Sequence, residues 1–140
     1  MSRVINTASP AKARNHARRT IAEILRRLMR KAKIDDEVRD MAATLVYCLR
    51  DIDATTEITC SAWEKRNYFV KADRFRLDWE WVASTAGSLA EVIATDRWYE
   101  LPLELARLAP RFADIRVAKM TRSPDVWAGA YDRLMTEASQ

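Results

Sequence analysis

Positive charge is concentrated at the start of the chain. Residues 1–34 contain ten Lys and Arg side chains and a single acid, Glu23, whereas residues 35–140 contain fourteen basic and nineteen acidic side chains. Basic side chains in such a segment can neutralise phosphates, which gives salt-dependent binding of nucleic acid or another anion. They can also form the solvated face of an ordinary helix. The side chains expected to contact an anion are Arg19, Arg26, Arg27, Arg30, Lys31 and Lys33.

A second group of residues could bind a protein. Between residues 72 and 93, apolar side chains at helical spacing define one face of a helix. Leu77, Trp81 and Val92 lie on the opposite side of the same helical wheel, and a helix that is apolar on two sides is covered on two sides. The second cover is either the C-terminal helix or another copy of the chain. If they are exposed, Leu77, Trp81 and Val92 form a patch typical of a protein interface.

Hydroxyl and thiol side chains gather at a third place, where the spacing predicts the seam between two helices. The residues are Thr56, Thr59 and Cys60, and they follow turns that carry Leu and Ile at the seam. Small polar side chains at a seam can line a pocket for a small ligand. Alternatively, the threonines bond to carbonyls of their own helix and let the neighbouring helix approach closely.

The sequence contains no recognisable catalytic or metal-binding constellation. His16 is the only histidine, so neither a nucleophile activated by histidine nor the Glu-x-x-His ligands of a di-metal bundle can be assembled. Asp53, Glu57 and Glu64 share a helix face, but this face flanks the apolar stripe as a solvated surface would. Two isolated glycines cannot form a loop that cradles phosphate. We therefore predict no catalytic residue, no metal site, no cofactor and no enzymatic activity.

Three functional hypotheses follow from these groups. The first is a non-catalytic helical module for interaction or assembly, which self-associates or binds a protein partner. The first alternative is an electrostatic nucleic-acid-binding protein that uses the basic first helix. The second alternative is a small-ligand-binding bundle that uses the cluster of Thr56, Thr59 and Cys60.

The cysteines and the hydropathy pattern bear on location. Cys48 and Cys60 fall in one expected helix, about 18 Å apart, which is too far for a disulfide between them. This use of cysteine predicts a reducing, cytoplasmic setting. No uncharged apolar run reaches the length of a membrane-spanning helix, so we predict no membrane span.

Helical periodicity predicts the elements that position these residues. Ser9-Pro10 is a typical helix start, and a regular apolar stripe from Ala17 to Ala32 follows it. A second helix begins after Asp35. A single helix over residues 36–95 would be about 90 Å long. We therefore predict a turn near Asn67, the residue in this stretch best suited to a left-handed cap.

Proline marks the remaining elements. Pro102 opens an expected fourth helix that runs to about Met120 and that Pro110 should kink or divide. Ser123-Pro124 begins a short final helix. With about half of its 140 residues hydrophobic and only two glycines, the chain suits one helical domain. The predicted fold is all-α, an antiparallel four-helix bundle of long helices with a short additional C-terminal helix. The domain spans residues 1–140, with residues 1–9 as a flexible N-terminal arm.

Overall fold

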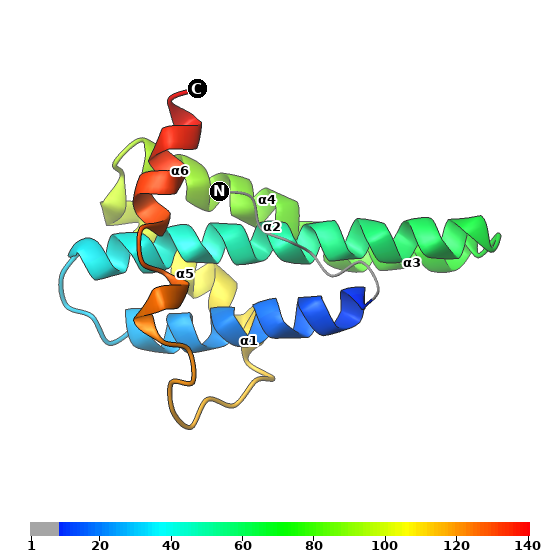
Figure 1. Cartoon of the computed structure of the whole chain (residues 1–140), viewed down its shortest axis with the longest axis horizontal. Coiled ribbons are helices and arrows are strands. Elements are labelled where there is room, and N and C mark those ends of the chain that lie inside the picture. The colour runs from blue at the N-terminus through cyan, green and yellow to red at the C-terminus, as the bar shows by residue number, and fades with distance from the viewer. Residues whose placement is uncertain (1–8) are drawn as a thin grey trace.

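The computed structural model describes residues 9–140, and these residues form helices and no strand, which confirms the all-α prediction. The predicted arm, residues 1–9, falls outside the described residues except for Ser9. Figure 1 shows the order of the elements. The α-helices are α1 (Pro10–Leu28), α2 (Asp36–Lys65), α3 (Phe69–Trp79), α4 (Trp81–Ala94), α5 (Leu101–Leu108) and α6 (Ala130–Ala138). Short 3-10 helices are η1 (Trp98–Glu100), η2 (Ala109–Phe112) and η3 (Pro124–Val126).

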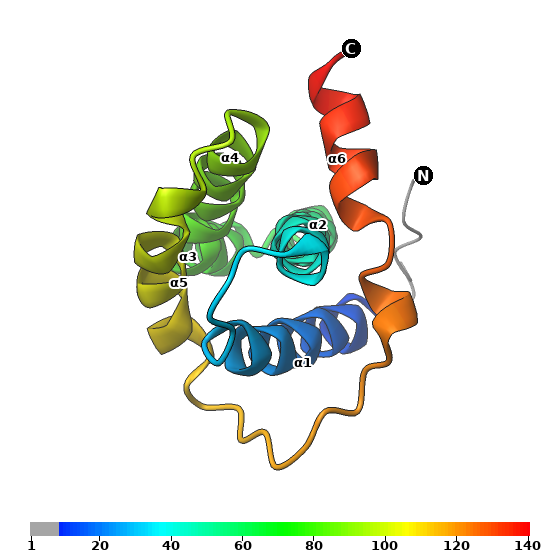
Figure 2. The ribbon, with the colours of Figure 1, turned by 90° about the vertical axis from the view of Figure 1, so that its left-hand side faces the viewer.

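Helix α2 lies at the centre of the molecule. It packs against α1, α3, α4 and α6, which surround it in Figure 2. Every residue from Met41 to Leu49 is buried, so this part of α2 is covered on all sides. A helix surrounded in this way has apolar or small side chains on every face, and Ala42 and Ala43 let the neighbouring helices approach closely. The hydrophobic core is therefore built around α2.

Helix α1 lies against α2 through the stripe that its sequence predicts. Ala17, Ile21, Ile24, Leu25 and Leu28 are all buried in this contact. The opposite face of α1 points away from α2. In Figure 2 the segment of residues 113–123 passes along this outward face. Arg18, Arg19 and Arg26 of α1 therefore lie beside a segment from the far end of the sequence.

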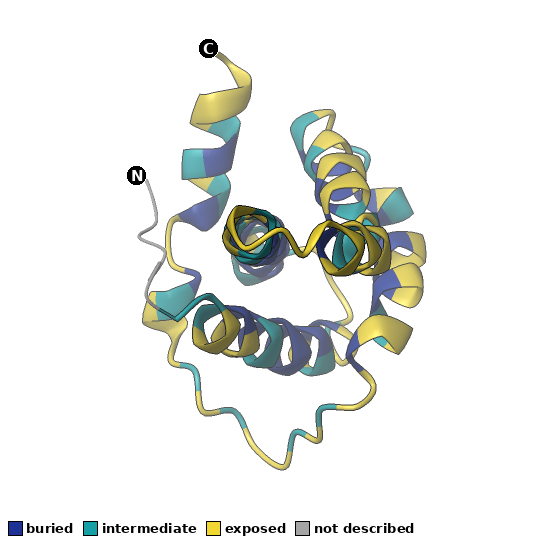
Figure 3. Ribbon diagram, turned by 90° about the vertical axis from the view of Figure 1, so that its right-hand side faces the viewer, coloured by how far each residue is buried: buried dark blue, intermediate teal, exposed yellow. Residues whose placement is uncertain are grey.

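The turn near Asn67 is confirmed. Asn67 has a φ of 64°, in the left-handed region, and the Tyr68 N–H donates to the Trp63 carbonyl at 2.9 Å. This pairing closes the C-terminus of α2. Helix α3 returns along α2, and the resulting hairpin projects beyond the end of α1 in Figure 1. Figure 3 shows that this projecting end is largely exposed.

The predicted fourth long helix is not present. Helix α5 ends at Leu108, η2 follows, and residues 113–123 have no helix. The reason is Pro110, which lacks an N–H and whose ring clashes with the preceding turn. An antiparallel bundle of four long helices is therefore not confirmed. The segment predicted as the fourth long helix, from Pro102 to about Met120, forms the short helix α5, the 3-10 helix η2 and a loop.

The C-terminal helix starts later than its sequence signal predicts. Pro124 opens η3, and α6 begins at Ala130 after Gly129, whose φ of 76° lies in the left-handed region that favours glycine. Trp127, Ala130 and Leu134 are buried and join the core. None of the helices described here combines the length and the hydrophobicity needed to cross a membrane.

Candidate anion-binding site

A buried carboxylate anchors the 113–123 loop to the outward face of α1. Glu23 has no exposed surface, although it lies opposite the core side of the helix. It accepts hydrogen bonds from Arg19 Nε, from the Thr121 N–H and hydroxyl, and from the Arg122 N–H. Burial alone raises the pKa of the Glu23 carboxyl, but the hydrogen bonds from Thr121, Arg19 and Arg122 outweigh burial and lower it to about 2. Glu23 is therefore a carboxylate at neutral pH.

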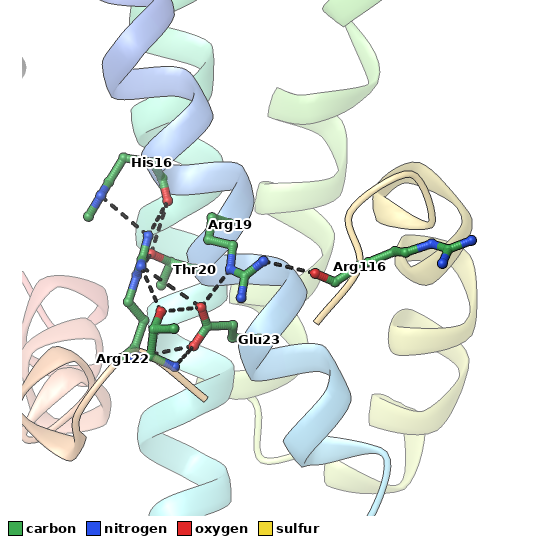
Figure 4. A network of polar contacts seen from close by, with 7 residues as sticks. His16, Arg19, Thr20, Glu23, Arg116 and Arg122 are labelled. Atoms are coloured by element: carbon green, nitrogen blue, oxygen red, sulfur yellow. Dashed lines mark hydrogen bonds and ion pairs between the residues drawn. The ribbon is translucent and has the colours of Figure 1, made fainter. Parts of the chain in front are cut away.

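The arginines around Glu23 also donate hydrogen bonds to other acceptors within the chain. Arg122 Nε donates to the Thr20 hydroxyl at 3.0 Å and its Nη2 to the His16 carbonyl at 3.2 Å. Arg19 Nη1 donates to the Arg116 carbonyl at 2.9 Å. Figure 4 shows this network. Helix α1 supplies the carboxylate of Glu23 and the guanidinium of Arg19, and the loop supplies the guanidinium of Arg122. We call the residues His16, Arg19, Thr20, Glu23, Thr121 and Arg122 the Glu23 cluster, and its role is to hold the loop on the helix.

One turn further along α1, the same loop and the same helix face enclose a hollow of about 370 Å³. Arg26 and Arg27 belong to the last turn of α1, and Arg30 and Lys31 follow directly after it. We call this hollow the basic pocket. Its lining consists of Arg26, Arg27, Arg30, Lys31, Ala118, Lys119 and Met120.

The cations of the basic pocket are only partly neutralised. Arg27 pairs with Glu37 at 3.0 Å, and Lys31 pairs with Asp35 at 2.8 Å and with Glu37 at 3.2 Å. The other three cations in its walls form no ion pair with a described residue, and these are Arg26, Arg30 and Lys119. The basic pocket thus carries positive charge that the described chain does not balance.

Arg26 carries the most informative detail of the basic pocket. Its side chain is half-buried, and its Nη1 atom is shielded from solvent without an acceptor among the described residues. A buried donor with no acceptor costs about 1–3 kcal/mol, and more when the group is charged. Rotation of the guanidinium toward an anion in the pocket would recover this free energy.

The helix dipole accounts for some of these cations. Positive side chains in the last turn of a helix are stabilised by about 0.3–1 kcal/mol, which suits Arg26 and Arg27. This effect does not extend to Lys119, which comes from the loop, nor does it satisfy Arg26 Nη1. The convergence of charge from two segments therefore needs a further explanation, and an anionic ligand provides one.

The structure separates the six cations that the sequence grouped together. Arg26, Arg27, Arg30 and Lys31 line the basic pocket, whereas Arg19 belongs to the Glu23 cluster. Lys33 lies in the connection after α1 and lines a different hollow. Sequence reasoning missed Lys119, because the chain was expected to be helical to about Met120 and no local pattern placed this segment over α1.

The predicted protein-binding patch is not assembled on the surface. Val92 is buried, and Trp81 is half-buried, stacked on Trp79 at 6.2 Å and in edge contact with Phe112 at 6.0 Å. The guanidinium of Arg111 lies 4.5 Å from the centre of the Trp81 ring. Only Leu77 of the three is exposed. The predicted single helix is divided into α3, which carries Leu77, and α4, which carries Trp81 and Val92, and Trp81 is covered by Phe112 and Arg111, which the sequence did not suggest.

The polar cluster on α2 is occupied by a side chain of the same molecule. Arg14 of α1 is buried and donates to the hydroxyls of Thr55 and Thr59 at 3.2 and 3.0 Å. Its guanidinium also lies over the rings of Phe75 and Trp79, at 5.0 and 5.5 Å from their centres. Burial lowers the pKa of the Arg14 guanidinium from its ordinary value.

The other two members of that cluster also bond within the helices. Thr56 is buried and donates to the Ile52 carbonyl at 3.0 Å. The Cys60 thiol donates to the Ala72 carbonyl at 3.4 Å, and burial raises its pKa, which keeps it protonated. The arrangement therefore corresponds to packing between α1, α2 and α3, and the residues predicted for a small-ligand pocket are used to join these helices.

Of the three predicted groups, the basic residues alone retain unbalanced charge around a hollow. Arginine and lysine side chains arranged in this way bind phosphate or carboxylate groups through charge-assisted hydrogen bonds. Compared with protein-family models, curated proteins and solved structures, the chain matches none of them.

Proposed function

We propose that this protein is a non-catalytic binding module for a compact phosphate-bearing anion, which it holds in the basic pocket. The observation that carries the proposal is the buried Arg26 Nη1, which has no acceptor among the described residues, on a side chain that lines the basic pocket together with four other cations. A phosphate group offers several acceptor oxygens and up to two negative charges, which suits the three cations without an ion pair among the described residues.

The distribution of ion pairs favours a compact anion over a long nucleic-acid backbone. Toward the start of α1, Arg18 pairs with Asp114 at 2.7 Å and Arg19 pairs with Glu23 at 2.7 Å. Arg18 and Arg19 are therefore neutralised within the chain, whereas Arg26, Arg30 and Lys119 around the basic pocket have no ion pair with a described residue. An extended backbone would need a continuous track of free cations.

The walls of the basic pocket support binding rather than chemistry. They offer guanidinium, ammonium and apolar groups, and the charged groups are proton donors that cannot act as bases in these forms. Self-association and binding of a protein partner stay predictions. Of the patch on which they were based, only Leu77 is exposed. We also place the protein in the cytoplasm, because Cys48 and Cys60 are both buried thiols.

Calorimetric titration with inorganic pyrophosphate at low ionic strength tests the proposal. We expect saturable binding that weakens as salt is added, since the contact is electrostatic. Replacing Arg26 or Arg30 with Gln should weaken binding about tenfold or more, the loss expected for one charge-assisted hydrogen bond. Arg66→Gln is the matched control, because Arg66 is an exposed arginine at the far end of the hairpin.

Three results would contradict the proposal. One is the absence of pyrophosphate binding at low salt, and another is an equal loss in the Arg66→Gln control. The third is a single-stranded oligonucleotide that binds far more tightly than pyrophosphate with the same dependence on Arg26 and Arg30, which would identify an extended backbone as the ligand.

A further inference from the structure

A second hollow adjoins the basic pocket and is mainly apolar. It has a volume of about 560 Å³ and lies between the connection after α1 and the segment formed by η1 and α5. We call it the apolar groove. Its walls include Met29, Ile34, Trp98, Tyr99, Leu101 and Leu105, together with the two cations Lys31 and Lys33.

The apolar groove exposes hydrophobic surface that the chain itself does not cover. Met29 is 61% exposed and Tyr99 is 79% exposed. Single exposed apolar residues are ordinary on a protein surface, but here they border one hollow of a size that binds small molecules. The groove therefore has the shape and the lining of a site for an apolar group.

Trp98 provides a firmly packed aromatic wall of the apolar groove. The residue is only 8% exposed, and its Nε1 atom is buried with no acceptor among the described residues. Its ring packs against Tyr131 at 6.0 Å and beneath the Arg39 guanidinium at 6.0 Å, so the indole is held in place. A buried indole N–H normally finds a partner. In the described chain, Arg26 Nη1 and Trp98 Nε1 are the two buried side-chain donors that lack one, and they lie in the walls of these two hollows.

Lys31 joins the two hollows, because its side chain lines both of them. Hydrogen bonds to Asp35 and Glu37 hold its ammonium group and raise its pKa, so the group stays charged. Lys33, also in the wall of the apolar groove, forms no ion pair with a described residue. The groove is thus apolar, and the charged side chains that line it have the same sign as those of the basic pocket.

We propose that one amphipathic ligand occupies both hollows, with a phosphate monoester head in the basic pocket and a single alkyl-type chain in the apolar groove. This inference rests on the proposed function, since the head occupies the site argued above. The charge distribution argues against a two-fold contact with a second copy of the chain, because such a contact would bring the same cations face to face. An amphiphile satisfies both the free cations and the uncovered apolar walls.

Three ligands that share either the head or the chain test this inference. Ethyl phosphate, decyl phosphate below its micelle concentration, and decan-1-ol are each titrated calorimetrically into the whole protein. Each methylene withdrawn from water tightens binding about fourfold. A groove that takes three or four methylenes should therefore make decyl phosphate bind on the order of 100-fold more tightly than ethyl phosphate. Decan-1-ol should bind much more weakly than decyl phosphate.

Variants of exposed groove residues distinguish the contribution of the ligand's alkyl chain to binding from that of its phosphate head. Met29→Ser and Tyr99→Ser should remove about tenfold or more of the advantage of decyl phosphate and leave ethyl phosphate unchanged. Leu103→Ser is the matched control, because Leu103 is 52% exposed on α5 and does not line the groove. Trp98→Phe keeps the aromatic ring and removes the N–H. Because an alkyl chain offers no acceptor for this N–H, the variant should bind both phosphate esters as the wild type does.

The outcomes distinguish the two proposals. If ethyl and decyl phosphate bind equally, or if Met29→Ser acts no more strongly than Leu103→Ser, the amphipathic ligand is wrong and the anion site stands. If decan-1-ol binds as tightly as decyl phosphate, the head is irrelevant and the inference is overturned. If neither pyrophosphate nor either phosphate ester binds, both the proposed function and this inference fail.

Discussion

The Glu23 cluster and the basic pocket are built from the same parts and differ in one component. Both lie on the outward face of α1, both are covered by the 113–123 loop, and both are rich in arginine. In the Glu23 cluster a buried carboxylate accepts from Arg19 and from backbone and side chain of the loop. In the basic pocket no carboxylate of the described chain reaches Arg26, Arg30 or Lys119.

This difference shows what decides the role of a surface arginine. Where the chain supplies an acceptor, the guanidinium becomes a structural link, and its removal should lower stability. Where the chain supplies none, the guanidinium adds little to stability and is available to a ligand. The Glu23 cluster and the basic pocket both contain arginines of α1. The role of each arginine therefore depends on whether the fold places an acceptor beside it.

The largest effect should come from removing the shared carboxylate. Glu23→Ala leaves the N–H groups of Thr121 and Arg122 without their acceptor and Arg19 without its ion pair. We expect the free energy of unfolding to fall by about 3 kcal/mol, as for other buried charge networks that lose one partner. Urea denaturation measures the change. A loss below about 1 kcal/mol, as for an exposed pair, would show that the cluster is not a structural link.

Acid should weaken the Glu23 cluster in a defined pH range. The pKa of Glu23 is lowered from 4.5 to about 2, so the unfolded chain takes up the proton first as the pH falls. The contribution of this group, about 3 kcal/mol, is therefore complete above about pH 5 and is lost as the pH falls toward 2. Unfolding curves at several pH values for the wild type and for Glu23→Gln should converge in acid. A gap that stays constant down to pH 2.5 would contradict the assignment.

Replacing one arginine from each part gives a direct comparison. Arg19→Met removes an ion pair of 2.7 Å to a buried carboxylate and should cost about 1–2 kcal/mol. Arg26→Met removes a buried donor without an acceptor and should leave stability within about 0.5 kcal/mol of the wild type, or raise it. Thermal and urea unfolding of the two variants measure the difference. Equal destabilisation would mean that the two arginines have the same structural role.

A small change in stability should also come from giving the basic pocket a carboxylate like that of the Glu23 cluster. Ala118→Glu places a carboxylate on an exposed loop position that lines the basic pocket. We expect a gain of less than about 1 kcal/mol, as for other exposed ion pairs, together with loss of pyrophosphate binding. Ala118→Gln is the control of similar size and should do neither. If the glutamate variant binds pyrophosphate like the wild type, the anion does not lie in the basic pocket.

Most of the helical elements could be predicted from the sequence because their signals are local. The stripe predicted from Ala17 to Ala32 repeats at helical spacing and is buried as far as Leu28, whereas Ala32 is exposed because α1 ends at Leu28. Asn67 is the one residue between two long helical patterns that adopts a left-handed turn readily, and it has a φ of 64°. The break at Pro110 was also visible, but its consequence was larger than expected, because the chain did not resume a helix after it.

The candidate site could be predicted only in part. Four of the expected cations, Arg26, Arg27, Arg30 and Lys31, do line the basic pocket, because they share one end of α1. The separation of Arg19 from this group could not be predicted, since it depends on a loop that local patterns described wrongly. The cover of Trp81 by Phe112 and Arg111 has the same origin.

The sequence by itself determined that the chain is helical, where its first two helices begin, which face of α1 is buried, and that its opposite face is basic. These properties follow from residue spacing within three or four positions. The tertiary structure decided which arginines are neutralised, because the contacts of Glu23 join residues 98 positions apart. Such contacts arise from packing, since the burial of α2 at the centre sets where the loop returns. The unbalanced charge at Arg26, Arg30 and Lys119 is therefore a property of the fold.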